Sequence, residues 1–364
     1  MLTPQTSQPL FSVRRWSVFS TGNYPYVCAR VRAKRANLLS HETYSKLLMM
    51  DIHEITRFLG ESKYKKEISE LGLNYSGFEL IDLALNRNMA EVYHQILGFC
   101  DGELYSMLSA YLQHEDVLNI KAVLRGKYYN AKTEEIMRAI CPAGKYPEEY
   151  WRSLVQKSKT VEEAMENLKG NEYFETLIRL KDEWGSNPAD FENQLERVYY
   201  SSLLGSIRSR SEANRVFIDY IHREIDLVNL KILLLTKFEH VEPEKILQML
   251  LADGELPEKT IQALVNASDF KSFLEELQKL AFSAMIHEKI GTIEQTNSLS
   301  HVIRALETEH LTRATKSSYQ HPLSILPILD YLVRKRIEVE NLRILARGKE
   351  KGLSDQVLRE LVVI

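Results

Sequence analysis

Three short stretches of the chain carry an acidic residue, an asparagine three positions later, a basic residue two positions after that, and a closing lysine. Carboxylate, amide and amine groups held together can bind a polar ligand, or they can cross-link neighbouring helices through hydrogen bonds and ion pairs. The three copies of this motif are Asp116, Asn119, Lys121 and Lys127; Asp226, Asn229, Lys231 and Lys237; and Glu338, Asn341, Arg343 and Lys349.

The motif spacing predicts three copies of one domain. The asparagines lie 110 and then 112 positions apart, which divides the 364 residues into three comparable units. A repeat of this length is too long for a short-period solenoid. Turn residues near Gly144 to Pro147 and Asp253 to Pro257 give the predicted borders. The predicted units are residues 23–144, 145–254 and 255–364, preceded by a tail at 1–22.

The motif is interpreted as a packing device. On a helix, an acid and an asparagine three positions apart share one stripe, and the apolar residues around them form a buried seam. An asparagine at the edge of such a seam can bond a neighbouring segment and fix its register. A ligand site repeated three times is the alternative, but no phosphate loop or convergent acid pair accompanies it. The pairs Lys121/Arg125 and Arg343/Arg347 are expected to form exposed basic stripes.

Other residue patterns that could carry chemistry are incomplete. Gly126-Lys127 and Gly144-Lys145 lack the second glycine and the hydroxyl residue of a phosphate-binding loop. His287-Glu288 has no second histidine four positions after the first, so a helical zinc pair is not expected. We therefore predict no catalytic residue, no cofactor and no metal.

One basic cluster is the candidate partner surface. Arg30, Arg32, Lys34 and Arg35 fall within six residues. Four bases so close together suit phosphate contacts, but no aromatic stacking platform accompanies them. Contact with an acidic protein surface, or simple exposure to solvent, is therefore favoured over nucleic acid.

Composition indicates a globular, helical chain without a membrane span. Hydrophobic residues make up 44% of the chain and charged residues 27%. The 47 basic and 50 acidic residues nearly balance, so the overall charge does not attract the chain to nucleic acid or to an anionic membrane. Glycine and proline are sparse, and apolar residues recur at steps of three and four over 26–57, 78–112, 191–238 and 323–347. No apolar run approaches 18 residues, and the three cysteines form no pair motif. The fold class predicted is all-α.

Several segments resemble one known family. The opening Tyr24-Pro25-Tyr26 with Arg30-Val-Arg32-Ala, the segment from Tyr111 to Lys127, and the ending around Glu338-Val-Glu-Asn341 are similar to the C subunits of archaeal and bacterial A/V-type ATP synthases. The d subunit of eukaryotic vacuolar ATPases belongs to the same family. The resemblance covers about Asn23 to Ile364 and favours the prokaryotic branch, but the tail at 1–22 has no place in it and is expected to be disordered.

The resemblance implies both a shape and a role. It implies three helical domains arranged as a funnel around a pseudo-threefold axis, on the cytoplasmic face of the membrane. Such a subunit is not an enzyme by itself. It seats the central stalk on the membrane rotor ring and transmits torque for ATP-coupled proton or sodium transport, without a transmembrane segment and without nucleic acid.

Two alternatives from other classes stay open. A soluble all-helical enzyme predicts a single pocket where carboxylates with shifted pKa values converge. A helical scaffold that binds nucleic acid through Arg30 to Arg35 predicts steeply salt-dependent binding.

Overall fold

A computed structural model describes residues 22–179, 188–207, 211–280, 284–296 and 299–362. Within these ranges every regular element is an α-helix, which confirms the all-α prediction. The tail predicted at 1–22 lies outside the described residues, apart from Gly22. No helix in the described ranges is both long and apolar enough to cross a membrane.

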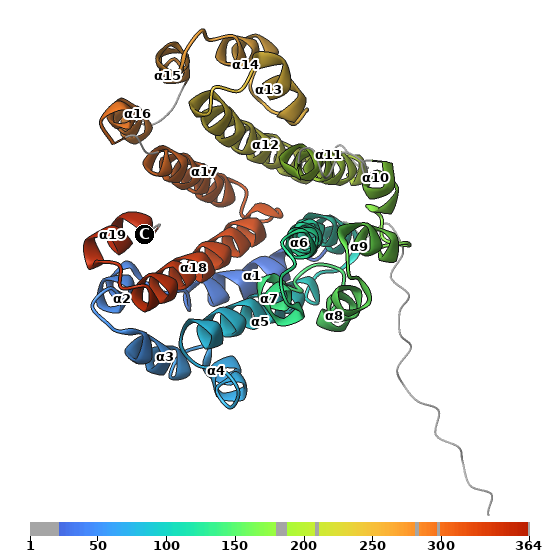
Figure 1. Cartoon of the computed structure of the whole chain (residues 1–364), viewed down its shortest axis with the longest axis vertical. Helices are drawn as coiled ribbons and strands as arrows, with labels where there is room; N and C mark the ends of the chain where they lie inside the picture. Colours follow the sequence, from blue (N-terminus) through green and yellow to red (C-terminus); the bar gives the residue numbers. More distant parts are fainter. Residues whose placement is uncertain (1–21, 180–187, 208–210, 281–283, 297–298, 363–364) are drawn as a thin grey trace, which may run out of the picture.

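Six long helices form three antiparallel hairpins, and each motif lies on the second helix of a hairpin (Figure 1). Four or five residues separate the two helices of each pair along the chain. The hairpins are α5 (Gly77–Leu97) with α6 (Gly102–Tyr128), α11 (Pro188–Ser206) with α12 (Glu212–Phe238), and α17 (Ser300–Gln320) with α18 (Leu326–Glu350).

Short helices fill the intervals between the hairpins. Before the first hairpin come α1 (Tyr24–Arg35), α2 (His41–Leu47), α3 (Ile52–Gly60) and α4 (Lys65–Leu71). Between the first and second come α7 (Thr133–Ala139), α8 (Glu148–Lys157), α9 (Val161–Asn167) and α10 (Phe174–Arg179). Between the second and third come α13 (Pro243–Met249), α14 (Glu258–Val265), α15 (Phe270–Gln278) and α16 (Ala284–Thr296), and α19 (Asp355–Leu361) follows the third.

Each motif helix packs along the first helix of another hairpin. Helix α6 packs on α11, and α12 packs on α17, so both partners follow in the sequence. Helix α18 packs instead on α5 and α1, near the beginning of the chain. The N-terminal and C-terminal parts of the chain therefore interlock. The unit borders drawn at 144 and 254 stay a prediction.

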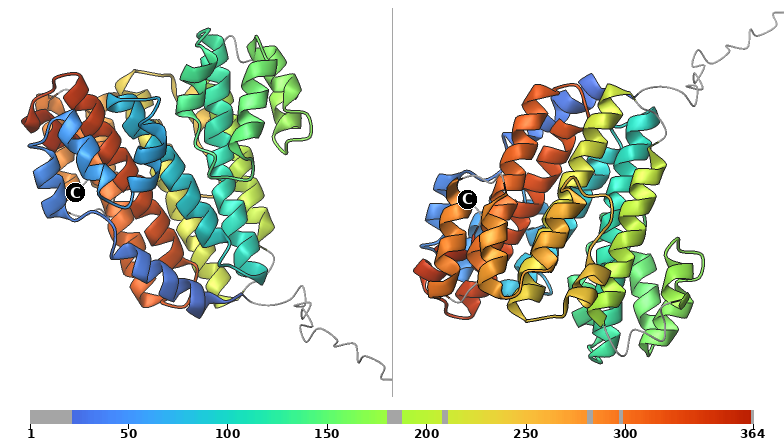
Figure 2. Two further views of the ribbon diagram at one scale, coloured as in Figure 1. Left: turned by 90° about the horizontal axis from the view of Figure 1, so that it is seen from below. Right: turned by 90° about the horizontal axis from the view of Figure 1, so that it is seen from above.

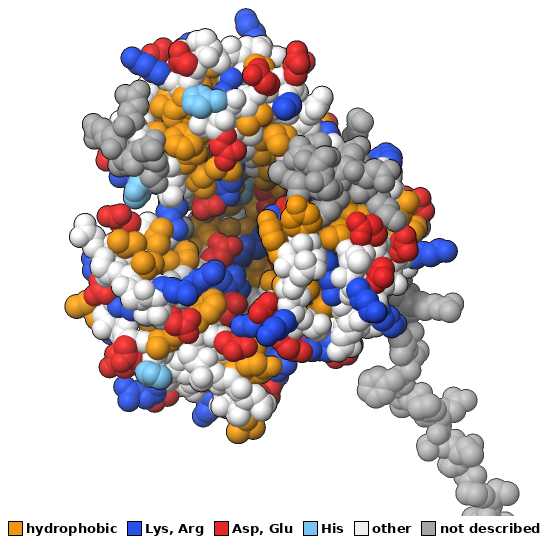
Figure 3. Space-filling view, in the orientation of Figure 1, with side chains coloured by type: hydrophobic (Ala, Val, Ile, Leu, Met, Phe, Trp, Pro, Cys, Tyr) orange, Lys and Arg blue, Asp and Glu red, His pale blue; other side chains and the backbone are white. Residues whose placement is uncertain are grey.

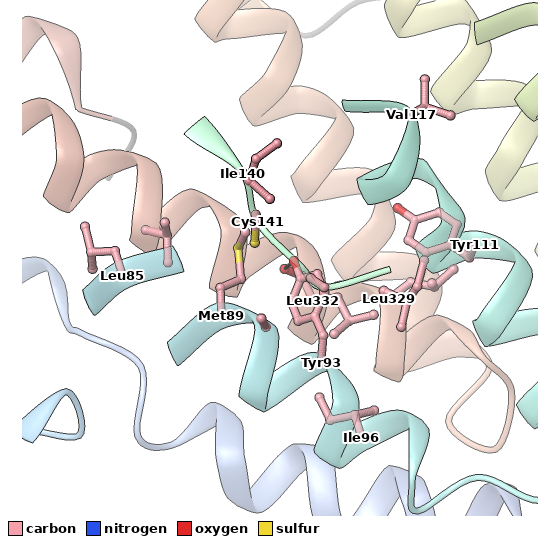
Figure 4. Close-up of a cluster of buried hydrophobic side chains, with 14 of the residues drawn as sticks. Leu85, Met89, Tyr93, Ile96, Tyr111, Val117, Ile140, Cys141, Leu329 and Leu332 are labelled. Carbon is pink, nitrogen blue, oxygen red and sulfur yellow. Dashed lines mark hydrogen bonds between the residues drawn. The ribbon is translucent and has the colours of Figure 1, made fainter. Parts of the chain in front are cut away.

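The main hydrophobic core joins segments that are distant in the sequence. Figure 4 shows side chains of α5, α6 and α18 meeting the segment after α7, with Tyr93, Cys141 and Leu332 among them. The Tyr93 hydroxyl donates to the Leu332 carbonyl at 2.9 Å. A second cluster of buried side chains is formed by α12 to α17.

The two ends of the molecule differ. The space-filling view shows a hollow between the hairpins, with acidic and basic side chains on its wall (Figure 3). Helix α1 lies on the far side in the matching ribbon view. Seen from the side, α1 lies with the α5–α6 turn and the α17–α18 turn at the end opposite the hollow's opening (Figure 2).

Candidate functional site

The motif acid holds the segment that follows the next short helix. The Asp116 carboxylate accepts hydrogen bonds from the backbone N–H of Lys145, at 2.7 Å, and of the residue after it, at 3.4 Å. Asp226 repeats the arrangement with Glu255 and the residue after it, both at 3.0 Å. Both acids lie on a motif helix, so each carboxylate ties its helix to a loop further along the chain.

A glycine precedes the donor segment in both copies because the carboxylate comes very close. A Cβ atom at Gly144 would overlap the carboxylate oxygens of Asp116. At Gly254 it would overlap an oxygen of Asp226. Only glycine therefore fits at these two positions without moving the loop.

Burial of these two carboxyls disfavours their charged form. It raises the pKa of Asp116 to about 7, although the two backbone N–H groups partly oppose the shift. The pKa of Asp226 is raised to about 6 for the same reason. The pKa values of both carboxyls are therefore raised towards neutral pH.

The motif asparagine bonds the backbone of one residue in both directions. The Asn119 amide donates to the carbonyl of Cys141 at 2.7 Å, and its oxygen accepts from the N–H of the same residue at 2.9 Å. Asn229 makes the same pair of bonds with Leu251, at 2.9 and 2.8 Å. Since these groups are buried, each amide pairs a backbone donor and acceptor that water does not reach.

The motif base forms an ion pair with the neighbouring hairpin. Lys121 Nζ lies 2.5 Å from a carboxylate oxygen of Glu196, and only 11% of its side chain is exposed. Burial alone would raise the pKa of Glu196, but His114 and Lys121 lower it to about 2. Lys231 pairs with Glu307 at 2.6 Å in the second copy.

The expectation of exposed basic stripes is therefore wrong at the first position of each pair. Lys121 is largely buried in its ion pair, and Arg343 is only 34% exposed. The second position fits the expectation better, because Arg125 is 60% exposed and Arg347 is exposed. The physical reason is that Lys121 and Arg343 each face an acid on the packed helix, Glu196 of α11 and Asp82 of α5. Arg125 also pairs with an acid of α11, Glu192, but keeps more of its side chain exposed.

The closing lysine of every copy donates a hydrogen bond to a backbone carbonyl. In each case the carbonyl belongs to a short helix or to the residues flanking one, and the ammonium complements its partial negative charge. The pairs are Lys127 with Val155 at 2.7 Å, Lys237 with Ala267 at 3.0 Å and Lys349 with Leu48 at 2.6 Å.

The third copy finds its partners at the beginning of the chain. Glu338 accepts from the Leu39 N–H at 2.7 Å, from Lys63 Nζ at 2.7 Å and from the Tyr64 hydroxyl at 2.6 Å. Lys335, one turn earlier on α18, lies 3.1 Å from the same carboxylate. A glutamate reaches one methylene further than the aspartates of the other copies.

Burial and charge pairing together set the pKa values of the buried side chains around Glu338. Burial lowers the pKa of Lys335 to about 8, although Glu338 opposes the shift. Burial disfavours the charged form of Glu338, but Lys335 and Lys63 more than compensate and leave its pKa below the usual value. Burial and the neighbouring Glu338 raise the pKa of Tyr64 well above its usual value. Glu338 thus stays ionised while Lys335 lies near the edge of its charged range.

The remaining polar residues of the third copy also bond the first helices. Arg343 donates to Asp82 and to the side-chain oxygen of Asn86, both at 2.6 Å. Asn341 hydrogen-bonds the Tyr44 side chain. The motif residues named from the sequence therefore lie in packing contacts in all three copies, and their role in stiffening the molecule stays a prediction.

The basic cluster on α1 does not converge on one point. Arg30 and Arg32 are exposed, whereas Lys34 and Arg35 are half-buried. The four side chains contact different elements: Arg30 lies 4.2 Å from the Phe99 ring centroid, Arg32 donates to the Pro322 carbonyl at 3.2 Å, Lys34 donates to Gln95 at 3.0 Å and Arg35 pairs with Asp330 at 2.7 Å. The partner surface that they were predicted to form stays a prediction.

Sequence reasoning missed the polar contacts that join the three motif helices to one another. Arg336 of α18 forms an ion pair with the buried Glu115 of α6. The Tyr111 hydroxyl of α6 donates to Glu224 of α12 at 3.0 Å, and α12 also packs on α18. Each charged member lies one or two positions before a motif acid, and this shared offset was the available signal.

The described residues contain no group of three histidine, cysteine, aspartate or glutamate side chains placed to hold a metal ion. Their three cysteines, Cys28, Cys100 and Cys141, are free thiols and are buried.

The fold and motif geometry define an all-helical protein with three cross-linked motif helices, and comparison identifies its family. Residues 27–361 match the model of the ATP synthase (C/AC39) subunit family, so the chain belongs to this family. A protein of Methanosarcina acetivorans, named as the C subunit of an A-type ATP synthase, is 38% identical, with 94% of each chain covered. A protein of the same name from Methanococcoides burtonii is 38% identical, with 95% of each chain covered. The one from Archaeoglobus fulgidus is 34% identical, over 94% of this chain and 96% of its own.

Proposed function

We propose that the chain is a non-catalytic adaptor in the central stalk of an A-type ATP synthase, at the cytoplasmic face of the membrane. In this role it seats the rotor shaft on the membrane rotor ring and transmits torque for ATP-coupled ion transport. The observation that carries the proposal is the direct linkage of three motif helices around a hollow, by Arg336 with Glu115 and by Tyr111 with Glu224. Membership of the ATP synthase subunit family supports it.

An adaptor must resist shear between its parts while torque passes through it. In our proposal three similar domains form a funnel whose hollow receives the shaft, and the end with the hairpin turns faces the ring. The repeated contacts support this, because each motif ties a long helix to a loop, to a second long helix and to a short helix. Buried contacts of this kind hold one arrangement of segments and give a packed interior little freedom to deform.

The composition of the complex is the first test. A tag on this chain would be used to purify complexes from gently solubilised membranes for native mass spectrometry. One copy together with stalk subunits and an intact ring supports the adaptor. A monomer that reproducibly lacks ring and stalk subunits, while the ATPase stays assembled, would favour the alternative of a helical enzyme.

A charge exchange tests the torque role directly. Arg336→Glu alone should lower ATP-driven ion pumping relative to ATP hydrolysis, because two carboxylates then face each other between α18 and α6. Adding Glu115→Arg should restore coupling. The matched control is exchange of the exposed surface pair Lys66 and Glu91, which should leave coupling unchanged. Full coupling in the Arg336→Glu variant, with the complex intact, would contradict the proposal.

A further inference from the structure

A polar pocket lies where α1, α4, α5 and α18 meet. Its volume is about 230 Å³, roughly that of eight water molecules, which is enough for a small ligand. Helices α1, α4 and α18 and the segment before α4 each contribute one lysine to the wall, namely Lys34, Lys66, Lys335 and Lys63. Ammonium groups gathered in one pocket repel one another unless carboxylates or a bound anion balance them.

Carboxylates balance only part of this charge. Glu67 and Glu91 also line the pocket, and Glu91 pairs with Lys66 at 2.9 Å. Glu338 is shared by two of the four lysines. Four ammonium groups therefore face three carboxylates, and an anion in the pocket would complete the balance.

Hydrogen-bond donors are available in the pocket. The Tyr331 side chain lines it and is only 4% exposed, but its hydroxyl makes no hydrogen bond to any residue that the structure describes. An ammonium group has three N–H donors, and none of the four lysines makes more than two hydrogen bonds to the described residues. Each lysine therefore retains a donor for a ligand.

Two acceptors beside these donors also lack partners. Glu67 Oε2 and Asn88 Oδ1 are buried and accept no hydrogen bond from the described residues. Both side chains line the pocket, and they bond each other through their remaining atoms, with Asn88 Nδ2 donating to Glu67 Oε1 at 2.9 Å. Buried polar atoms are usually paired, so a ligand that brings a proton of its own would satisfy one of these oxygens.

We propose that this pocket binds a hydrogen phosphate group, either as the free ion or as the monoester of a small molecule. Phosphate oxygens accept charge-assisted hydrogen bonds from ammonium and hydroxyl groups, here the lysines and Tyr331. A phosphate group still holds a proton near pH 6, and this proton can be donated to the unpartnered oxygen of Glu67. Sulfate matches the lysines but has no such proton. The site does not depend on the adaptor role, so each proposal can fail separately.

Calorimetric titration of the purified full-length chain near pH 6 tests the site. The probes are inorganic phosphate, glycerol 3-phosphate and sulfate. We expect both phosphates to bind and sulfate to bind at least about tenfold more weakly, because sulfate leaves the buried acceptor unpaired. Tighter binding of glycerol 3-phosphate supports a monoester as the ligand, and tighter binding of inorganic phosphate supports the free ion. Equal binding of sulfate, or no binding of either phosphate, would overturn the proposal.

Variants of the pocket and a matched control complete the design. Tyr331→Phe should weaken phosphate binding about tenfold and leave Tm unchanged, because the hydroxyl has no partner among the described residues. Lys34→Gln with Lys66→Gln should weaken it by at least about tenfold. The control, Lys46→Gln with Lys65→Gln, changes two exposed lysines outside the pocket and should leave binding unchanged. Undiminished binding by either pocket variant, or an equal loss in the control, would refute the site.

Discussion

Replacing Asn119 with leucine removes the two hydrogen bonds that the motif makes to Cys141. Leucine has a similar volume but no polar atom, so a buried backbone donor and a buried acceptor lose their partners. Each orphaned group costs about 1–3 kcal/mol, and the added apolar burial offsets about 1–2 kcal/mol. The two groups together cost about 2–6 kcal/mol, so we expect the free energy of unfolding to fall by about 1–4 kcal/mol. Over a chain of this length that corresponds to roughly 1–5 °C in Tm.

The assay is thermal and guanidinium unfolding followed by circular dichroism, on the purified chain. Asn229→Leu should give a loss of similar size, because Asn229 makes the same two bonds to Leu251. Asn74→Leu is the matched control, since Asn74 is exposed, and should shift Tm by little. An Asn119→Leu protein with wild-type Tm would refute the reasoning. Loss of ATPase coupling at unchanged stability would assign the asparagine a functional role instead.

Three further perturbations follow from the same contacts. The pKa of Asp116 is raised to about 7 in the folded state, so the folded chain holds this proton more tightly than the unfolded chain does. The protonated carboxyl therefore stabilises the fold fully below about pH 4, and this contribution declines as the pH rises towards 7. Asp116→Asn should flatten the decline of Tm between pH 5 and 8. An unchanged slope of Tm against pH would contradict the raised pKa of Asp116. Glu338→Gln leaves the buried Lys335 without its countercharge and should lower the free energy of unfolding by about 3–5 kcal/mol. Adding Lys335→Met should recover part of this loss. Purely additive effects of the two substitutions in chemical denaturation would contradict the pairing. A chain ending before Glu338 loses the partners of Leu39, Lys63 and Asp82. It should therefore fail to couple ATP hydrolysis to ion pumping, and its N-terminal helices should become accessible to limited proteolysis. Intact coupling would contradict the adaptor proposal.

The helical fold and the packing position of the motif were predictable because they rest on local patterns. Apolar residues at three- and four-residue steps indicated the long helices. The asparagine was expected to bond a neighbouring segment, and Asn119 does so. These inferences need only the residues within a turn or two of helix.

The partners of the motif were not predictable from one sequence. Lys121 looked solvent-exposed because its acid, Glu196, lies 75 residues away on another hairpin. Arg336 and Glu115 are 221 residues apart, and only the folded arrangement brings them together. Helix periodicity tells which face is apolar, but it does not tell which helix covers that face. The base of a polar motif is therefore misjudged whenever its acid lies on a distant element.

The pairing of α5 with α18 governs how the chain can be made. Asp82 emerges from the ribosome long before Arg343, which follows it by 261 residues, so the helices around Asp82 cannot complete their packing during synthesis. Until the last helices appear, the apolar face of α5 needs shielding from solvent and from other nascent chains. Only a chain that has been translated as far as α18 can therefore bury the apolar face of α5, so a truncated chain leaves that face exposed.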